Sequence, residues 1–207
     1  MTLPLSKTLD PADYAELVEE LQIVDLHFGR AREQHPQRRW EYALALRAIQ
    51  EWGRISPAGV CRHVDVGGAG SPFRYMPDAP VEIVDPDETV SLAEYLDGCS
   101  RLASVVTCLS VLEHVDDLDR FCYHLSCLVA PGGLLFLTMD YWDQDGPDTA
   151  HFHWDRKRIF GPSLYRDTAE SFLDHDFVWF GERELTYHGH QLFGSYSFAS
   201  LSLVKRA

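Results

Sequence analysis

The chain lacks a long hydrophobic run, a paired-cysteine motif and an excess of positive charge. Its most apolar stretch, residues 125–139, is interrupted by Pro131-Gly132-Gly133, so we do not expect it to cross a bilayer. The first fourteen residues contain no apolar segment of the kind that a secretory signal needs. A net charge of −14 disfavours a surface that follows the phosphates of a nucleic acid. We therefore expect neither a membrane nor a nucleic acid as partner.

The five cysteines form no CxxC pair and are odd in number. Three of them lie in apolar runs, as reduced thiols in the core of a cytoplasmic protein do. No internal repeat and no low-complexity tract is present, and 207 residues suffice for one domain with a substantial core. We therefore expect a cytoplasmic protein of one domain.

Helical and strand patterns alternate along most of the chain. An amphipathic helix follows Asp10-Pro11, and a second helix follows Pro36 and ends near Gly53. Further helix candidates are 116–129 and 162–174. Short apolar runs predict strands at 61–66, 81–84, 104–109, 133–139, 176–182 and 196–204. This alternation predicts an α/β fold with a mostly parallel sheet covered on both faces, in which the last two strands could form an antiparallel edge.

The first crossover between strands is too short for a full helix. Only ten residues separate Gly70 from Val81, and the segment contains Pro72, Pro77 and Pro80. We expect one helical turn or an irregular loop there. Shortened crossovers could leave a sheet face that a second copy of the chain covers, so homo-oligomerisation is an open expectation.

The most informative segment is VDVGGAGSP at 64–72, followed by VEIVDP at 81–86. A Gly-rich turn after one strand and an acid after the next are typical of the cofactor corner of an open α/β sheet. For a dinucleotide, however, Phe73 occupies the position of the third glycine, and Pro72 removes a backbone N–H from the turn. Asp65 would also repel a phosphate. These features speak against a nicotinamide-dependent dehydrogenase.

A cofactor that carries a cation fits this corner better. Asp65 could hold an ammonium group, directly or through backbone carbonyls and water, and Asp85 could accept hydrogen bonds from both hydroxyls of a ribose. S-adenosylmethionine meets both requirements, because it joins a nucleoside to an amino acid without a phosphate. The alternative is a tight turn with two ordinary surface acids.

Four segments together resemble the class I S-adenosylmethionine-dependent methyltransferases. They are VDVGGAGSPF, VEIVDPD, VVTCLSVLEHVDDLDRF and LVAPGGLLFLTM, in the family's order. The resemblance covers residue 36 to about 205. It implies a Rossmann-like sheet of seven strands with the last one antiparallel, an N-terminal helical lid over 1–55 and a cofactor-binding core over 56–207.

The resemblance also implies which residues bind the cofactor. The turn packs against its methionine part, Asp85 binds the ribose, and Pro86 lies near the adenosine. The end of the strand at 104–109, which corresponds to the family's fourth strand, lies near the sulfonium. Arg39 is expected to pair with the cofactor carboxylate, while Trp40 and Tyr42 either belong to the lid or pack their helix. The predicted cofactor residues are Arg39, Asp65, Gly67, Gly68, Ala69, Gly70, Asp85, Pro86, Leu109, Ser110 and Val111.

The chain departs from the family pattern at two of these segments. Ala69 stands where the second glycine is usual, and the fourth strand begins with Ala103-Ser104 in place of an acid. The resemblance implies methyl transfer to an O, N or C nucleophile of a small molecule. A catalytically inactive scaffold or binding protein with this fold is the alternative.

Two histidines are candidates for a base or an acceptor-positioning group. His114 follows Glu113 at the turn after the strand at 104–109. Alternatively, this pair serves only to stabilise the start of the following helix. His153 lies among aromatic and acidic residues at 140–155, which suit the wall of an acceptor pocket. His151 and His153 with Asp140 or Asp155 could bind a metal ion, but an isolated HxH is a weak signal and we expect no metal.

Overall fold

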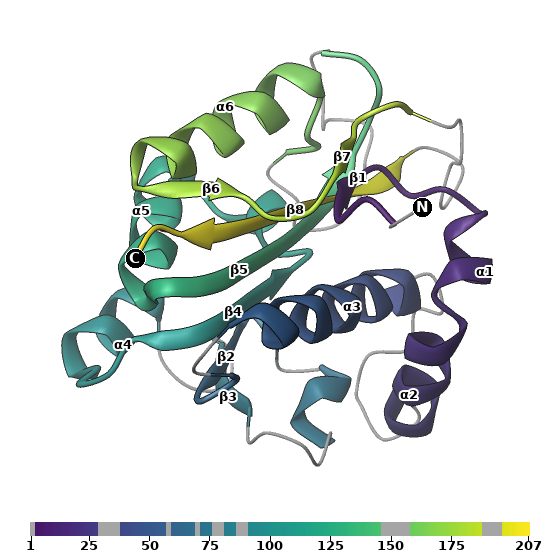
Figure 1. The fold of residues 1–207 in the computed structure, drawn as a ribbon. Coiled ribbons are helices and arrows are strands. Elements are labelled where there is room, and N and C mark those ends of the chain that lie inside the picture. Colours follow the sequence, from purple (N-terminus) through teal and green to yellow (C-terminus); the bar gives the residue numbers. More distant parts are fainter. Residues whose placement is uncertain are drawn as a thin grey trace.

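A six-stranded sheet runs through the middle of the molecule and carries helices on both faces (Figure 1). The computed structural model describes residues 3–28, 38–56, 59–68, 71–75, 81–85, 91–145, 158–187 and 196–207. The strand order is β3 (Val81–Val84), β2 (His63–Val66), β4 (Ala103–Leu109), β5 (Val129–Tyr141), β8 (Ser197–Lys205) and β6 (Phe177–Trp179). The first four are parallel, and β8 runs antiparallel to β5 and β6. The predicted α/β class and the antiparallel last strand are thus confirmed.

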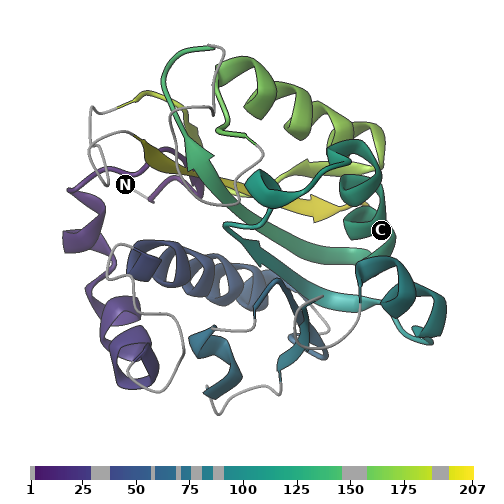
Figure 2. The same ribbon diagram turned by 180° about the vertical axis from the view of Figure 1, so that it is seen from behind.

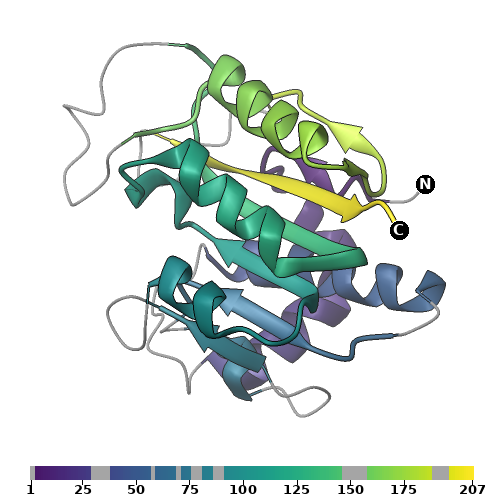
Figure 3. The same ribbon diagram turned by 90° about the vertical axis from the view of Figure 1, so that its left-hand side faces the viewer.

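Three helices cover one face of this sheet, and the N-terminal helices cover the other (Figure 3). The first group is α4 (Leu92–Gly98), α5 (Leu118–Leu128) and α6 (Pro162–Asp174). Because side chains alternate along a strand, Val106, Cys108 and Leu137 join the core under α4 to α6, whereas Val105, Leu109 and Phe136 join the core under α3 (Arg39–Ile55). The same alternation turns Asp65 and Thr107 toward the α3 side.

Helix α3 belongs to the core of the protein. Its residues Trp40, Leu44, Ala48 and Trp52 repeat every fourth position and are all buried. The indole Nε1 of Trp40 donates to Asp13 Oδ2 at 2.8 Å, which fastens α1 (Asp13–Glu16) to α3. Helix α2 (Val18–Phe28) lies against α3 (Figures 1 and 2). The expected lid over 1–55 is therefore not confirmed, since α3 is one layer of the core.

The early crossovers are short, as predicted. A single 3-10 turn, η2 (Pro72–Tyr75), stands between β2 and β3. Helix α4 begins with a capping box formed by Ser91 and Glu94, and only residues 99–102 separate it from β4. Residues 91–102 therefore leave no room for a further strand beside β3. The expectation of seven strands is not confirmed, because the described residues form six strands in this sheet.

The N-terminal segment adds a second, two-stranded sheet. Strand β1 (Ser6–Lys7) pairs in parallel with β7 (Arg183–Glu184) and lies across β8.

All five cysteines are free thiols, and Cys108 and Cys122 are buried. Among the described helices, none combines the length and the apolar character needed to cross a membrane.

Candidate functional site

The glycine turn follows β2 directly and requires glycine at two positions. Gly67 has φ +74°, and a Cβ there would lie 2.3 Å from Val111 Cγ2. A Cβ on Gly68 would lie 2.2 Å from Asp65 Oδ2. The turn is thus held close to both the β2 acid and the end of β4. The predicted residues Ala69, Gly70 and Pro86 lie outside the described part of the chain.

Asp85 lies beside this turn. Strands β2 and β3 are parallel with Val66 opposite Val84, and the Gly67 N–H donates to the Val84 carbonyl at 2.7 Å. Asp85 is the next residue along β3 and is buried. The two acids predicted for the cofactor corner therefore come from the ends of adjacent strands, with the glycine turn between them.

Asp65 is held by a chain of buried polar side chains. Thr107, its register neighbour on β4, donates its hydroxyl to Asp65 Oδ1 at 2.6 Å. The Thr107 hydroxyl is also 2.8 Å from His63 Nε2, and burial lowers the pKa of His63 to about 3, so the imidazole is neutral. Asp65 Oδ2 is buried and has no hydrogen-bond partner among the described residues. Burial raises the pKa of Asp65 to about 6, and the Thr107 hydroxyl opposes part of that rise.

This raised pKa predicts that stability falls as the pH rises through about 6. The folded protein holds the Asp65 proton to a higher pH than the unfolded chain does, so ionisation opposes folding by about 3 kcal/mol in total. Between pH 5 and pH 8, the free energy of unfolding of the wild type should drop by roughly 1–2 kcal/mol relative to Asp65→Asn. Urea denaturation of both proteins at the two pH values measures this difference. Parallel pH profiles would contradict the prediction.

The end of β4 is fastened to α3 through Glu41. Ser110 has φ +51°, in the left-handed region, and donates its hydroxyl to Glu41 Oε1 at 2.6 Å. Thr138 on β5 donates its hydroxyl to the same oxygen, and the Ser110 N–H donates to the Thr138 hydroxyl at 3.1 Å. Leu109 is buried, whereas Ser110 and Val111 are half-buried at the strand end. This strained turn lies at the carboxyl end of β4, where the sulfonium was predicted.

Arg38, and not Arg39, reaches the carboxyl end of β4. Its guanidinium donates to the Leu109 carbonyl at 2.8 Å and to Glu41 Oε2 at 3.0 Å. Arg39 instead forms an ion pair with Asp25 on α2. Consecutive helix residues point about 100° apart, so only one of the two arginines can face the strand ends. The structure thus turns Arg39 toward α2 and Arg38 toward the strand ends, and the pairing of Arg39 with the cofactor carboxylate stays a prediction.

Trp40 and Tyr42 are packing residues. Trp40 is fully buried, and the Tyr42 ring meets the Phe73 ring edge-on with centroids 5.4 Å apart. Through Phe73 this contact connects α3 to the turn that follows the glycines.

Three further carboxyl groups are buried near the ends of β4 and β5. Glu41, Glu113 and Asp140 are each no more than 2% exposed. Burial raises the pKa of Glu113 well above its usual range, and the charges of Asp140 and Glu41 add to the rise. The described residues contain no group of three His, Cys, Asp or Glu side chains arranged to hold a metal ion.

His114 is the exposed neighbour of Glu113. Both belong to the short helix η3 (Leu112–His114), in which Glu113 is buried. The His114 N–H donates to the Val111 carbonyl at 2.9 Å. A role for His114 as a base stays a prediction. His153, with His151 and Asp155, lies outside the described residues.

Comparison with solved structures shows which proteins share this fold. No family model matches the sequence, and no curated protein matches it either. Among solved structures, the N-methyltransferase NodS from Bradyrhizobium japonicum aligns with a TM-score of 0.54 and 12% identity, covering 84% of this chain and 99% of that one. The chain has the class I methyltransferase fold. Phosphoethanolamine N-methyltransferase 2 from Haemonchus contortus aligns with a TM-score of 0.51 and 11% identity, over 79% of this chain and 52% of that one.

A third neighbour shows that the class I methyltransferase fold is not restricted to one reaction. The [4+2]-cyclase SpnF aligns with a TM-score of 0.50 and 15% identity, over 95% of this chain and 94% of that one. The reaction of the present chain must therefore be argued from its own residues.

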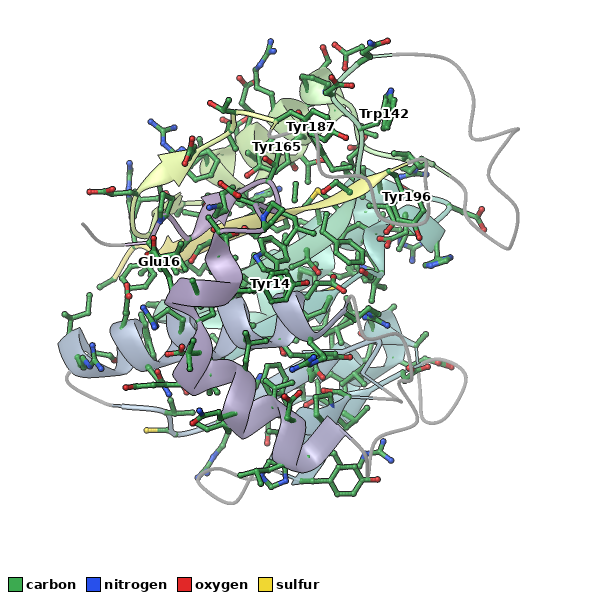
Figure 4. The ribbon with its side chains drawn as sticks, turned by 90° about the vertical axis from the view of Figure 1, so that its right-hand side faces the viewer. Tyr14, Glu16, Trp142, Tyr165, Tyr187 and Tyr196 are labelled. Carbon is green, nitrogen blue, oxygen red and sulfur yellow. The ribbon has the colours of Figure 1, made fainter. Side chains whose placement is uncertain are left out.

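Aromatic side chains lie at the end of β5 and directly after it. Trp142 lies beside Tyr187, with ring centroids 6.2 Å apart (Figure 4). Tyr141 also lies near Tyr187, with ring centroids 6.4 Å apart, and it meets Tyr165 and lines with Tyr187 a groove of about 580 Å³ along α6. Tyr187 therefore contacts both aromatic residues at the end of β5, while residues 146–155 of the predicted pocket wall lie outside the described part of the chain.

Sequence reasoning missed several polar residues of the site: Arg38, Glu41, Thr107, Glu113 and Thr138. A signal for some of them exists, because Thr107 and Thr138 interrupt otherwise apolar strands, and Glu41 lies on the buried face of α3. A buried polar residue needs a hydrogen-bond partner. Arg38 and Thr138 are both bonded to Glu41, and Thr107 is bonded to Asp65.

Proposed function

We propose that the protein is a cytoplasmic S-adenosylmethionine-dependent methyltransferase that acts on a small molecule. The observation that carries the proposal is the pair of buried acids, Asp65 and Asp85, on either side of the Gly67-Gly68 turn. Buried carboxylates at a ligand corner favour a cation and hydroxyl donors over a phosphate. S-adenosylmethionine offers an ammonium group, a sulfonium and two ribose hydroxyls.

The residues of this corner fit that cofactor. Asp85 would accept hydrogen bonds from both ribose hydroxyls, and the unfilled Oδ2 of Asp65 would attract the cationic methionine end. Arg38 would pair with the cofactor carboxylate, because its guanidinium already reaches the end of β4. When bound, the cofactor supplies a methyl group activated by the positive charge on sulfur.

The protein's own contribution is placement and the exclusion of water. Ser110 and Val111 would line the transfer point, held in place by Glu41 and by the contact of Val111 with the glycine turn. The acceptor supplies an O, N or C nucleophile, and His114 or His153 would assist by taking a proton or by orienting it. The net charge of −14 supports a small-molecule acceptor over a nucleic acid.

Isothermal titration calorimetry with S-adenosylmethionine and S-adenosylhomocysteine tests the proposal. Both ligands should bind with dissociation constants of about 1 μM to 1 mM. If neither binds at millimolar concentration, the proposal fails. Binding of both without transfer to any acceptor would favour the alternative, a scaffold protein that has kept the fold and the cofactor site.

A further inference from the structure

We propose that His63 and Thr107 are positioning residues of the cofactor corner, which hold Asp65 as a carboxylate directed at the glycine turn. This inference rests on the proposed function and adds two residues that act through Asp65. Both lie inside the sheet, since His63 is the first residue of β2 and 4% exposed, and Thr107 is fully buried in β4.

The strand register brings the three side chains into one row. Asp65 lies opposite Thr107 on the neighbouring parallel strand, and His63 is two residues before Asp65, so it points to the same face of the sheet. The Thr107 Oγ1 atom lies 2.6 Å from Asp65 Oδ1 and 2.8 Å from His63 Nε2. The His63 ring packs against the Phe73 ring, with centroids 5.3 Å apart. A buried hydrogen-bond chain therefore connects the start of β2 to the cofactor corner.

The direction of this chain follows from the hydrogens that its members can donate. A carboxylate only accepts hydrogen bonds, so Thr107 must donate its single hydroxyl hydrogen to Asp65. Thr107 then accepts from His63, whose imidazole must carry its hydrogen on Nε2. Because burial lowers the pKa of His63 to about 3, the imidazole is neutral near pH 7, and Nδ1 carries no hydrogen. In this tautomer His63 does not compete with Asp65 for the hydroxyl hydrogen of Thr107.

The second oxygen of Asp65 lies against the glycine turn. A Cβ on Gly68 would be only 2.2 Å from Asp65 Oδ2. The hydrogen bond from Thr107 to Oδ1 keeps the carboxyl group in this orientation. A carboxylate held in this way would meet the cationic methionine end of the cofactor without first having to rotate, which reduces the cost of binding.

The groups around Asp65 act in opposite directions on its charge. Burial raises the pKa of Asp65, and the charge of Asp85 after β3 adds to the rise. The hydroxyls of Thr107 on β4 and Ser71 before η2 lower it, as does the Arg38 guanidinium at the start of α3. The balance is a pKa of about 6, so Asp65 ionises just below neutral pH. Without the Thr107 hydroxyl, Asp65 should hold its proton to a higher pH.

The pH dependence of binding tests the role of Thr107. The affinity for S-adenosylhomocysteine, measured by calorimetry, should rise about 10-fold from pH 5 to pH 7, because Asp65 must ionise to bind the ammonium group of the ligand. Thr107→Val should move the midpoint of this rise upward by about one pH unit or more, since a hydrogen bond to a charged group contributes about 1.5–3 kcal/mol.

Two further variants separate the hydroxyl from general effects of packing. Thr107→Ser keeps the hydroxyl and should keep the wild-type midpoint. Thr168→Val, which removes a buried hydroxyl from α6, is the matched control and should also leave the midpoint unchanged. A wild-type affinity that stays constant between pH 5 and pH 7, or a wild-type midpoint in Thr107→Val, would overturn the proposal.

The ¹⁵N chemical shifts of the His63 ring test the direction of the chain without any substitution. With S-adenosylhomocysteine bound at pH 7, Nε2 should be protonated and Nδ1 should not. The opposite tautomer would show that Thr107 donates to His63, and it would overturn the positioning role of both residues. Failure of S-adenosylhomocysteine to bind at any pH between 5 and 8 would instead refute the proposed function, and this inference with it.

Discussion

Replacing Asp85 with alanine is expected to weaken the binding of S-adenosylhomocysteine by about 100-fold or more. A carboxylate that accepts two ribose hydroxyls makes two charge-assisted hydrogen bonds, each contributing about 1.5–3 kcal/mol. Loss of both removes about 3 kcal/mol at least, and 2.7 kcal/mol corresponds to about 100-fold in affinity. Calorimetry of the wild type and Asp85→Ala with the same ligand measures the effect.

Asp97→Ala is the matched control for that experiment. Asp97 lies on α4, is exposed, and carries the same charge in the segment that follows β3. Its loss should leave the affinity within about twofold of the wild type, since exposed charges interact weakly through water. An unchanged affinity in Asp85→Ala would show that this acid does not hold the ribose, and a large effect of Asp97→Ala would indicate a general effect of charge.

The sheet could be predicted from the sequence because each of its strands is an apolar run bounded by turn residues. Strand β3 covers Val81–Val84, as expected, and β4 begins one residue earlier than predicted. Strand β5 begins at Val129, before the expected residue 133, since Pro131 is tolerated where the register with β4 shifts. The pairing of β1 with β7 could not be foreseen, because two-residue strands show no periodicity.

The candidate site could be predicted only where a motif fixes the backbone. The glycine turn and the two acids after β2 and β3 follow from local spacing, and the structure brings them together. The choice of Arg38 over Arg39 depends on the rotation of α3 against the sheet. The same holds for Glu113 and His114, because which of two adjacent residues faces inward is decided by tertiary packing in a one-turn helix.

A Gly67→Ala substitution is expected to lower the free energy of unfolding by about 2–5 kcal/mol. At φ +74°, the left-handed conformation costs an L-residue about 1–2 kcal/mol, and the added Cβ would lie 2.3 Å from Val111 Cγ2. Such overpacking costs about 1–3 kcal/mol. Urea denaturation at pH 7 measures the loss.

The matched control is Gly98→Ala in α4, where an added Cβ meets nothing within 4 Å and φ is not positive. Alanine favours a helix over glycine by up to about 1 kcal/mol, so this variant should be as stable as the wild type or slightly more stable. The Gly67→Ala protein that remains folded should also bind S-adenosylhomocysteine more weakly, because Val111 and the turn must move apart at the transfer point. A variant with wild-type stability and affinity would mean that the turn can relax without Gly67, and that the contact between Gly67 and Val111 does not shape the site.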